Sequence, residues 1–466
     1  MKPLYRWSAL NHVFTKNNVH AILNALKLKP LYVDTSLLEA LQLFAAGATA
    51  EDIIAQVPGE LQQKLIKLVP IAIEAKILIK ADISDAEILD FFRDNYLGKP
   101  YISIAYFILT DACNFGCKYC FVENRMPTAH TFQRMSVDTV KRGLDFFCRQ
   151  IQLKPGLFEK EKTIVIYGGE PLLNMPALKA LLEEVDQRKT NGCLPEKTEL
   201  SMVTNAALVT EDVADLLAKH KVNVAVSIDG DKDATNSARQ YKDGTGVYDN
   251  VIKGYRLLCE RGANTGISCT LNQQSVDNFD ATLDTLLNQL GVASLGFNLV
   301  LPSKEYPVPA DYDEKASQAI ILAFKKFREL GIFEDRIMRK VDAFVKGEIH
   351  AFDCGASGGG QIVIAPNGQV GICHGYLGNR KYFPTTVYDL IFDPEKNSTF
   401  KEWSFRSPLS MSQCQKCPAL GICGGGCPLN AEFEHGSIWE LDQRFCVHTK
   451  ASLEWLIWDL YEQITK

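Results

Sequence analysis

Long apolar runs are missing from this sequence. Its apolar runs, such as Ile362–Ala365 and the mostly apolar Ile102–Ala105, fall far short of the ~20 residues that a membrane-spanning helix needs. The N-terminal residues likewise contain no apolar run of signal-peptide length, so we expect a cytoplasmic protein without a membrane partner. An excess of positive charge is also missing, because 50 Lys and Arg face 56 Asp and Glu. This acidic balance argues against a nucleic-acid partner, whose footprint would be basic.

Internal repeats and low-complexity segments are absent as well. The share of hydrophobic residues is 46%, that of charged residues is 23%, and glycine and proline occur 32 and 19 times. These values are those of an ordinary globular protein, and they exclude the disordered and collagen-like classes. With 466 residues, the chain has room for about three domains of ordinary size.

Cysteine, by contrast, is abundant, with 14 residues. Ten of them fall into two groups with short spacings, and four stand alone. The first group is Cys113, Cys117 and Cys120; the second is Cys354, Cys373, Cys414, Cys417, Cys423, Cys427 and Cys446; the isolated ones are Cys148, Cys193, Cys259 and Cys269. Thiols at such spacings, in a chain without a signal peptide, indicate metal ligands in a reducing compartment. The isolated cysteines are expected to be buried as small hydrophobic residues.

Residues 1–95 are expected to form a small domain of their own. Alternating apolar and polar residues around Trp7–Phe14 and His20–Val33 indicate strands. Three helical patterns follow: one opened by the capping box Ser36-Leu37-Leu38-Glu39, one opened at Thr49, and one over Glu60–Leu78. Strands followed by three helices favour a winged-helix-like layout.

Residues 100–305 alternate regularly between strand and helix patterns. The expected strands are Ile102–Leu109, Thr163–Tyr167, Leu200–Val203, Val222–Ile228, Thr265–Leu271 and Ser294–Val300. The expected helices are Val137–Gln150, Met175–Arg188, Glu211–His220, Val247–Arg261 and Val276–Leu290. This alternation predicts the α/β class with a parallel sheet, either open or curled into a partial barrel. In such sheets the functional groups lie at the carboxyl ends of the strands.

The remaining residues form two further regions. Residues 306–350 contain two helical stretches, Asp313–Leu330 and Arg336–Lys346, that look like a bridge. Residues 351–466 are rich in glycine and cysteine and show little periodicity before a final helix over Ser452–Ile464. A region with so few packed elements needs cross-links, which bound metal would supply.

Directly after the first expected strand comes the spacing Cys113-x3-Cys117-x2-Cys120. Three thiolates from one loop can hold a metal centre, but a closed zinc site needs a fourth ligand, and His130 lies ten residues farther on. Three thiolates on a [4Fe–4S] cluster would leave one iron open for a substrate or cofactor. Structural cysteines and a degenerate zinc loop are the alternatives.

With aromatic Tyr119 before its last cysteine, this loop resembles the signature of the radical S-adenosylmethionine (SAM) superfamily. The resemblance implies a partial (β/α)6 TIM-like barrel. It implies as well that the three cysteines hold a [4Fe–4S] cluster whose open iron chelates the methionine part of SAM. It also implies that one electron from the cluster cleaves SAM to a 5′-deoxyadenosyl radical, which abstracts hydrogen from the substrate.

Further motifs at strand ends resemble those of the same family. Gly168-Gly169-Glu170-Pro171 resembles the GGEP motif that contacts the SAM amino group, although a glycine-rich turn is the alternative. The resemblance also implies which residues bind the ribose and the methionine carboxylate of SAM, namely Thr204, Asn205, Ser227, Asp229 and Arg239. Ala206 stands where the family usually has glycine, and Arg239 could instead be a solvated surface charge.

The seven C-terminal cysteines match the pattern of the SPASM extension, which carries two auxiliary [4Fe–4S] clusters. The family arrangement implies one cluster held by Cys414, Cys417, Cys423 and Cys446 and another held by Cys354, Cys373 and Cys427. The second set has three thiols, so its open iron could bind a substrate thiolate, or a distant cysteine, a histidine or water could complete it. A zinc ribbon is the rival interpretation. His374, after Cys373, is a candidate proton acceptor or hydrogen-bonding neighbour of the cluster.

The order of these regions is similar to that of radical SAM/SPASM peptide maturases, whose winged-helix elements bind the leader of a precursor peptide as an added strand. We therefore expect an oxygen-sensitive enzyme that modifies a ribosomally made peptide, forming a thioether or another intrapeptide cross-link. The resemblance implies an electron donor of the flavodoxin or ferredoxin type. The alternatives are an enzyme of the anaerobic sulfatase-maturating type, which oxidises a Cys or Ser side chain, and an iron–sulfur electron-transfer or scaffold protein.

Overall fold

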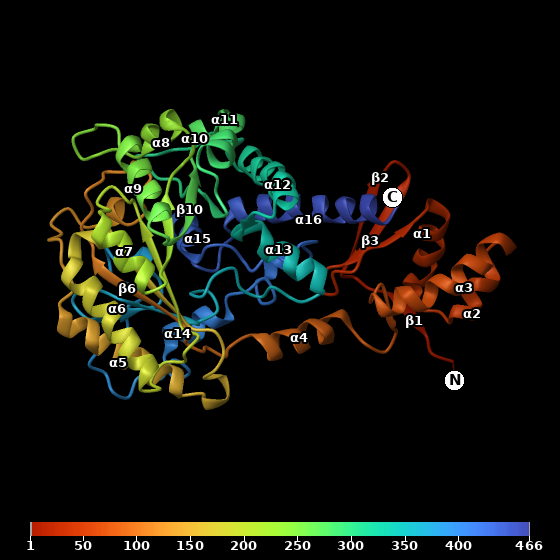
Figure 1. Cartoon of the computed structure of the whole chain (residues 1–466). Coiled ribbons are helices and arrows are strands. Elements are labelled where there is room, and N and C mark those ends of the chain that lie inside the picture. The colour runs from red at the N-terminus through yellow and green to blue at the C-terminus, as the bar shows by residue number, and fades with distance from the viewer. Residues whose placement is uncertain (1, 466) are drawn as a thin grey trace. The chain divides into compact units, whose positions relative to one another are not determined.

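The computed structural model describes residues 2–465, and its contacts divide the chain into two units (Figure 1). One, here called the sheet unit, comprises Gly98–Arg336 and Gly355–Phe405. The other, here called the cysteine-rich unit, comprises Met1–Leu97, Ile337–Cys354 and Arg406–Lys466. None of the helices in the described part of the chain combines the length and the apolar character that a membrane span requires.

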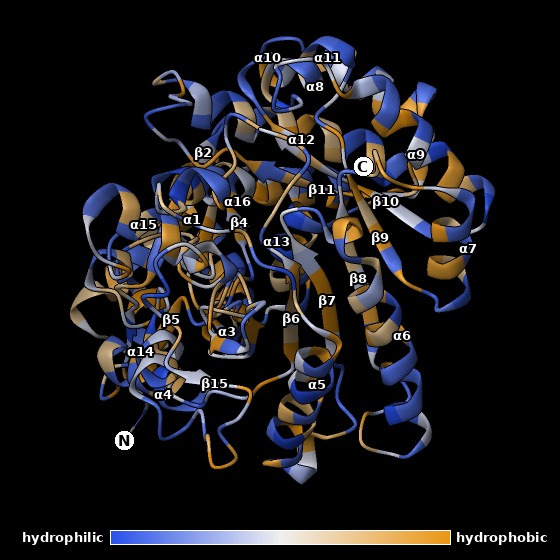
Figure 2. Cartoon of the chain, turned by 90° about the vertical axis from the view of Figure 1, so that its left-hand side faces the viewer, coloured by the Kyte–Doolittle hydropathy of each residue, from blue (hydrophilic) through white to orange (hydrophobic). Residues whose placement is uncertain are grey.

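A ten-stranded sheet forms the centre of the sheet unit. Six of its strands are parallel and neighbour one another in chain order: β6 (Ile104–Thr110), β7 (Thr163–Gly168), β8 (Glu199–Thr204), β9 (Asn223–Ser227), β10 (Asn264–Leu271) and β11 (Ser294–Leu299). Their residues are mostly apolar (Figure 2), as expected for a sheet that is covered on both faces. The predicted α/β class and parallel sheet are confirmed, and the strand order is that of a partial (β/α)6 barrel.

Helices connect these strands as the alternation predicted. They are α5 (Val137–Gln152), α6 (Met175–Thr190), α7 (Glu211–Lys219), α8 (Lys232–Ala238), α9 (Tyr248–Glu260), α10 (Gln273–Asp277) and α11 (Phe279–Asp284). The prediction of one helix over Val276–Leu290 was wrong, because Asn278, with φ −116° and ψ 47°, interrupts the helical backbone between α10 and α11. The short helix α8 was not predicted; the Asp231 side chain caps it by accepting a hydrogen bond from the amide of Ala234.

Both edges of the sheet extend beyond these six strands. At one edge β12 (Phe333–Glu334) pairs with β11. At the other, β13 (Gln361–Ile364) pairs in parallel with β6, and β14 (Gln369–Gly371) and β15 (Thr385–Thr386) follow in antiparallel pairing. The last three were not predicted, because β13 is a short apolar run without alternation. The predicted bridging helices are present as α12 (Tyr312–Leu330) and α13 (Asp335–Lys346), of which α13 belongs to the cysteine-rich unit from Ile337 on. The helix α14 (Ser398–Phe405) completes the sheet unit.

The N-terminal part of the cysteine-rich unit contains strands followed by helices, as predicted. Its elements are β1 (Tyr5–Trp7), β2 (Asn11–Lys16), β3 (Val19–Asn24), β4 (Leu31–Val33), α1 (Thr35–Gln42), α2 (Ala50–Gln56), α3 (Gly59–Glu74), β5 (Leu78–Lys80) and α4 (Asp85–Tyr96). The order β2-β3-β4 forms an antiparallel sheet, and β1 pairs with β5. The predicted capping box at Ser36 was wrong, since Asp34 caps α1; the capping box lies instead at Ser84 and Glu87, on the unpredicted α4.

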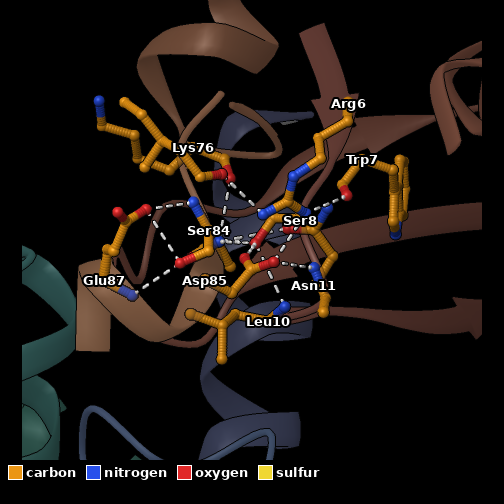
Figure 3. A network of polar contacts seen from close by, with 12 residues as sticks. Arg6, Trp7, Ser8, Leu10, Asn11, Lys76, Ser84, Asp85 and Glu87 are labelled. Atoms are coloured by element: carbon orange, nitrogen blue, oxygen red, sulfur yellow. Dashed lines mark hydrogen bonds and ion pairs between the residues drawn. The ribbon is translucent and has the colours of Figure 1, made fainter. Parts of the chain in front are cut away.

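Polar side chains connect β1, the start of β2, the residues just before β5 and the start of α4 (Figure 3). The Arg6 guanidinium forms an ion pair of 2.7 Å with the carboxylate of Asp85, the first residue of α4. The Asn11 amide donates to the carbonyl of Ile77 at 2.8 Å, and the Asn24 amide donates to that of Lys76 at 2.9 Å. The ion pair thus joins α4 to β1, and the two amide hydrogen bonds join β2 and β3 to the segment before β5.

The N-terminal elements share hydrophobic cores with the C-terminal part of the same unit, which contains α15 (Pro428–His435) and α16 (Gln443–Ile464). Leu10 and Leu26 pack in one core with Leu409 and Leu420, and a second core includes residues of β3 and α16. The Tyr32 hydroxyl also donates a hydrogen bond to a carbonyl of α16. The residues before Leu97 and those after Arg406 therefore stabilise each other.

Candidate functional site

The loop with the first three cysteines follows β6 and is held by the segment after α8. The amide of Gly116 donates to the carbonyl of Gln240 at 2.8 Å, and the amide of Lys118 donates to that of Ala238 at 2.9 Å. Phe115 is buried and packs edge-on against Tyr241, with 5.1 Å between the ring centroids. This loop is thus fixed at the carboxyl end of the sheet.

The thiols of Cys113, Cys117 and Cys120 lie close enough to affect one another's pKa. Burial, followed by smaller effects that include the neighbouring thiols, raises the pKa of Cys113 and of Cys117 to about 12. The amide of Phe115 donates to the Cys113 sulfur at 3.4 Å, and the amide of Glu123 donates to the Cys120 sulfur at 3.3 Å. Such amides stabilise thiolates, and coordination to a cation removes the thiol proton. The three residues therefore fit a shared metal centre.

A single metal ion does not fit this geometry. Within residues 2–465, no three His, Cys, Asp or Glu side chains converge closely enough to hold one ion.

Gly168 and Gly169 bring the end of β7 against the start of this loop. A Cβ atom on Gly168 would lie 2.2 Å from the carbonyl oxygen of Thr110, and one on Gly169 would lie 2.2 Å from that of Ala112. The amide of Gly169 donates to Thr110 at 2.8 Å, and that of Glu170 donates to Ala112 at 2.9 Å. Any larger side chain here would displace the cysteine loop, so the glycines serve the backbone contact.

The Glu170 carboxylate is buried and largely satisfied by its neighbours. One oxygen accepts from the amide of Leu172 at 3.1 Å and from the Thr204 hydroxyl at 2.8 Å, and the other accepts from the amide of Asn205 at 2.8 Å. Burial raises the pKa of Glu170 to about 7, although these hydrogen bonds favour the ionised form. A carboxylate has about four acceptor positions, so one remains for a further donor such as an ammonium group.

The segment after β8 adopts the backbone that the family pattern implies. Ala206 has φ 56° and is fully buried, so it keeps a left-handed conformation that glycine adopts more easily. The Asn205 amide donates to the Asn114 side chain at 2.8 Å and lies 3.9 Å from the Cys113 sulfur. Asn114 was missed by the sequence analysis because nothing in its spacing distinguishes it from any other loop residue.

The ends of β9 and β10 meet at a buried carboxylate, Asp229. The Arg239 guanidinium donates to both of its oxygens, at 2.9 and 3.0 Å, the Tyr119 hydroxyl donates to one of them, and the amide of Thr270 donates at 3.0 Å. These four donors occupy the acceptor positions of Asp229, which therefore orients Arg239 and Tyr119. The third guanidinium nitrogen, Nη1, takes part in none of these bonds and is available to a carboxylate ligand.

Arg239 is buried rather than a solvated surface charge. Its guanidinium also lies over the Tyr119 ring, 5.4 Å from the centroid. Ser227, the last residue of β9, is buried at the same end of the sheet. The structure thus brings the candidate SAM residues together where the parallel strands end, as the fold rule predicted.

His374 lies between three aromatic rings of the sheet unit. It stacks on Tyr106 with 4.9 Å between centroids and a 17° interplanar angle, and it contacts Tyr167 at 4.9 Å and Phe121 at 5.5 Å. Burial lowers the pKa of His374 to about 4. The imidazole is therefore neutral at pH 7, and its Nδ1 atom is buried without a hydrogen-bond partner.

Six of the seven C-terminal cysteines belong to the cysteine-rich unit, and Cys373 belongs to the sheet unit. Burial first, and then nearby thiols of the expected set, raise the pKa of Cys414 and of Cys446 to about 12. Burial and the neighbouring Asp442 raise the pKa of Cys427 to about 11, with a smaller contribution from Cys354. These neighbours match the division into a set of four and a set that includes Cys354 and Cys427; the place of Cys373 in it stays a prediction.

The isolated cysteines only partly match the expectation of packing residues. Cys148 and Cys269 are buried, and Cys193 is half-buried. The expectation was wrong for Cys259, which is exposed. It lies in the last turn of α9, where the helix pattern does not distinguish the solvent side of a terminal turn.

A comparison with protein-family models decides the class of this site. Residues 107–286 match the model of the radical SAM superfamily. These residues form a radical SAM domain. The radical SAM domain contains the first cysteine loop, the Gly168–Glu170 segment and the Asp229–Arg239 pair.

Two relatives of known class are similar over most of the chain. A radical SAM cyclopropyl synthase, TigE of Paramaledivibacter caminithermalis, is 26% identical over 359 residues, which are 73% of this chain and 70% of TigE. A cysteine-type anaerobic sulfatase-maturating enzyme of Clostridium perfringens is 24% identical over 391 residues, which are 76% of this chain and 96% of that enzyme.

Two solved structures share the fold. The enzyme anSMEcpe with bound AdoMet and a peptide superposes with a TM-score of 0.64 at 19% identity, covering 78% of this chain and all of that one. SuiB of Streptococcus suis, bound to its precursor peptide SuiA, superposes with a TM-score of 0.54 at 15% identity, covering 95% of this chain and 99% of SuiB. At these identities the likeness establishes the fold of the radical SAM domain and its surroundings.

Proposed function

We propose that this chain is a radical SAM enzyme that modifies a peptide after translation. The observation that carries the first part is the buried network of Asp229, Arg239 and Tyr119 next to the three-thiol loop. The peptide part is supported by the relatives, since the sulfatase-maturating enzyme, SuiB and anSMEcpe are named or described with protein or peptide partners.

The residues present fit a [4Fe–4S] cluster and SAM. Cys113, Cys117 and Cys120 would hold the cluster through three thiolates. The remaining acceptor position of Glu170 suits the SAM ammonium group, and the Arg239 Nη1 atom suits its carboxylate. When bound, the cluster and SAM together supply a 5′-deoxyadenosyl radical that abstracts a hydrogen atom from the substrate.

This chain's own residues bind and orient these groups. Asp229 holds the Arg239 fork in one plane through two hydrogen bonds, which fixes the direction of its third nitrogen. Thr204 and the amide of Asn205 orient the Glu170 carboxylate in the same way. Because Asp229, Glu170 and Thr204 are all buried, they exclude water from the polar end of the site.

The ten clustered cysteines are proposed to hold three clusters, one for SAM and two auxiliary ones. The set of Cys414, Cys417, Cys423 and Cys446 is supported by their mutual proximity, and that of Cys354, Cys373 and Cys427 rests on the spacing resemblance. The open position in the second set favours a thioether or another intrapeptide cross-link, because it suits a substrate thiolate. Electrons would come from a donor of the flavodoxin or ferredoxin type.

The N-terminal elements are proposed to bind the leader of the precursor peptide in a winged-helix-like manner. The sheet β2-β3-β4 has two outer strands, and such edges can accept an extended peptide as an additional strand. The exposed Val13 on β2 would give this strand an apolar contact.

A sulfatase-maturating type of activity is the second candidate. The similarity to the Clostridium perfringens enzyme spans almost all of that enzyme, which favours it. The resemblance implies, however, that a candidate aspartate base follows the corresponding cysteine in that family, whereas His374 follows Cys373 in this chain. Because this chain lacks a carboxylate at that place, we rank this activity second.

One experiment tests the proposal and separates it from an iron–sulfur scaffold or electron-transfer role. After anaerobic reconstitution, the chain should carry about twelve irons and convert SAM to 5′-deoxyadenosine in the presence of a reductant. Replacing Cys113, Cys117 and Cys120 by alanine should abolish 5′-deoxyadenosine while about eight irons remain. A wild-type chain that holds its clusters and never cleaves SAM would be a scaffold or carrier. For the peptide part, a product lighter by two hydrogen atoms indicates a cross-link or oxidation of a side-chain alcohol to an aldehyde, and carbonyl labelling separates these two; larger losses indicate cleavage or group transfer.

A further inference from the structure

Five charged side chains are buried in the cysteine-rich unit, and they gather around its cysteines. They are Lys340, Asp353, Arg406, Asp442 and Arg444. Each of them is at most 6% exposed. Burying so many charges is unfavourable unless they are paired or face a bound ion, so their arrangement indicates what this region is built to hold.

Four of the five charges form two neutral pairs. The Lys340 ammonium lies 3.0 Å from the Asp353 carboxylate. The Arg444 guanidinium donates to both oxygens of Asp442, at 3.0 and 2.7 Å. Asp442 also accepts from the backbone amide of Cys427 at 3.1 Å, so this pair contacts the cysteine loop directly.

Among residues 2–465, no carboxylate pairs with the fifth charge, that of Arg406. Its Nη1 donates to the carbonyl of Gly425 at 2.8 Å, its Nη2 to that of Glu440 at 3.2 Å, and its Nε to that of Ile438. Arg406 is completely buried. These three carbonyls accept one hydrogen bond from each guanidinium nitrogen but do not neutralise the positive charge, so the five residues leave a net charge of +1.

The position of Arg406 shows which negative groups could balance this charge. Gly425, its hydrogen-bond partner, lies between Cys423 and Cys427, and a Cβ atom on Gly425 would come within 3.2 Å of the Arg406 Nη1. The groups that act electrostatically on Arg406 are Cys427, Asp442, Cys354 and Cys423. Since Asp442 is already paired with Arg444, the remaining partners are thiols of both expected cluster sets.

We propose that Arg406 is the shared counter-charge of the two auxiliary clusters and sets their reduction potentials. This inference rests on the proposed function, because it requires clusters on those thiols. When a one-electron reductant such as dithionite gives an electron to a cluster, the cluster gains one negative charge and the reductant is oxidised. A fixed guanidinium charge nearby stabilises that reduced state and raises the potential.

The geometry explains why the residue is an arginine. The planar guanidinium presents donors in a fixed fork, and here three carbonyls from separate loop positions accept them. A lysine could carry the charge but could not make the same three bonds at once. Arg406 therefore fixes both the charge and the loop that carries Cys423 and Cys427.

The test is a redox titration of the reconstituted full chain in which Cys113, Cys117 and Cys120 are replaced by alanine, so that only the auxiliary clusters contribute. Arg406→Gln should lower the equilibrium constant for reduction of at least one cluster tenfold or more, which is 59 mV for one electron. Arg406→Lys, which keeps the charge, should stay within threefold of the parent. Asp353→Asn removes a negative charge next to Cys354 and should move the constant in the opposite direction.

Lys162→Met is the matched control. Lys162 is also a buried cation that donates to three carbonyls, at 2.9, 2.9 and 2.6 Å, but those belong to residues 157, 158 and 160 of the sheet unit. Its removal should leave the potentials unchanged. If Lys162→Met shifts the reduction potentials as much as Arg406→Gln does, the assignment is overturned. It is also overturned if Arg406→Gln and Arg406→Lys both retain their iron and have the same reduction potentials.

Iron content separates the possible failures. About eight irons with an unchanged potential in Arg406→Gln would overturn the role of Arg406 and leave the clusters in place. If Arg406→Gln does not retain its iron, the reduction potential of Asp353→Asn becomes the test of the inference. An unchanged potential in that variant overturns it. A parent chain with no auxiliary iron would overturn the proposed cluster sets themselves.

Discussion

Replacing Asp229 by asparagine tests the polar end of the candidate SAM site. The substitution keeps the shape of the side chain but removes the charge that faces Arg239 across two hydrogen bonds of 2.9 and 3.0 Å. Both side chains are buried, at 0% and 9% exposure. Breaking a buried pair by changing one partner leaves an uncompensated charge and costs about 3–5 kcal/mol.

Asp249→Asn provides the matched control, because Asp249 pairs with Lys232 at 2.7 Å but both side chains are more than half exposed. Exposed pairs of this kind contribute about 0–1 kcal/mol. The two variants therefore remove the same chemical group from pairs of similar length, and they differ in burial.

Hydrogen exchange followed by mass spectrometry is the suitable assay, since it reports the stability of β9 and β10 separately from the cysteine-rich unit. The amide of Thr270 donates directly to Asp229 and should lose protection. At 1.36 kcal/mol for each factor of ten, Asp229→Asn should accelerate exchange of these strands by roughly two to nearly four powers of ten. Asp249→Asn should change it by less than about tenfold.

Two outcomes would refute this reasoning. Exchange in Asp229→Asn no faster than in Asp249→Asn would mean that the buried pair does not stabilise the strand ends. A second substitution, Arg239→Gln in the Asp229→Asn background, should restore part of the protection, because it removes the unpaired charge. Purely additive losses would contradict the pairing.

Three further predictions concern the same end of the sheet and the first cysteine loop. Because burial raises the pKa of Glu170 to about 7, the folded site without SAM takes up a proton as the pH falls through 7. Binding of the SAM ammonium should therefore weaken, by up to tenfold per pH unit below 7, in calorimetric titrations. An affinity that does not change with pH would contradict this prediction. Glu170→Gln should weaken binding and remove that pH dependence. Gly169→Ala should displace the loop that carries Cys113, since the added Cβ would lie 2.2 Å from the Ala112 oxygen. The iron content should then fall from about twelve to about eight atoms per chain. The control variant Gly156→Ala, whose added Cβ meets open space, should bind iron normally.

Spacing and strand–helix alternation were sufficient to predict the parallel sheet and the candidate cofactor residues. Each of those residues lies at the carboxyl end of a strand, so chain order alone brings Glu170, Asp229 and the cysteine loop to one edge of the sheet. What a side chain bonds to there is a different matter. Nothing in the sequence indicates that donors of the protein itself occupy all the hydrogen-bond acceptor positions of Asp229.

The burial of Arg406 and the strand β13 were missed for one physical reason, which is dependence on residues distant in sequence. β13 becomes a strand because it pairs with β6, more than 250 positions earlier. From its neighbours Phe405 and Ser407, Arg406 is indistinguishable from an ordinary surface charge. It is buried because the loops at Gly425 and Ile438 cover it and accept its hydrogen bonds. Ser36 has the pattern of a helix cap, but Asp34, two residues before it, offers its carboxylate to the same turn and caps the helix.

The hydrophobic cores that join residues before Leu97 to those after Arg406 have a consequence for the protein during its synthesis. At about 5–20 residues per second, the ribosome needs roughly 15–60 s to make the stretch between these two segments. During that interval β3 and α4 exist without α16 and the cysteine loops that complete their core. The residues before Leu97 thus reach their final packing only after the segment beyond Arg406 has been made, and Arg406 can complete its three hydrogen bonds only once Glu440 has been made.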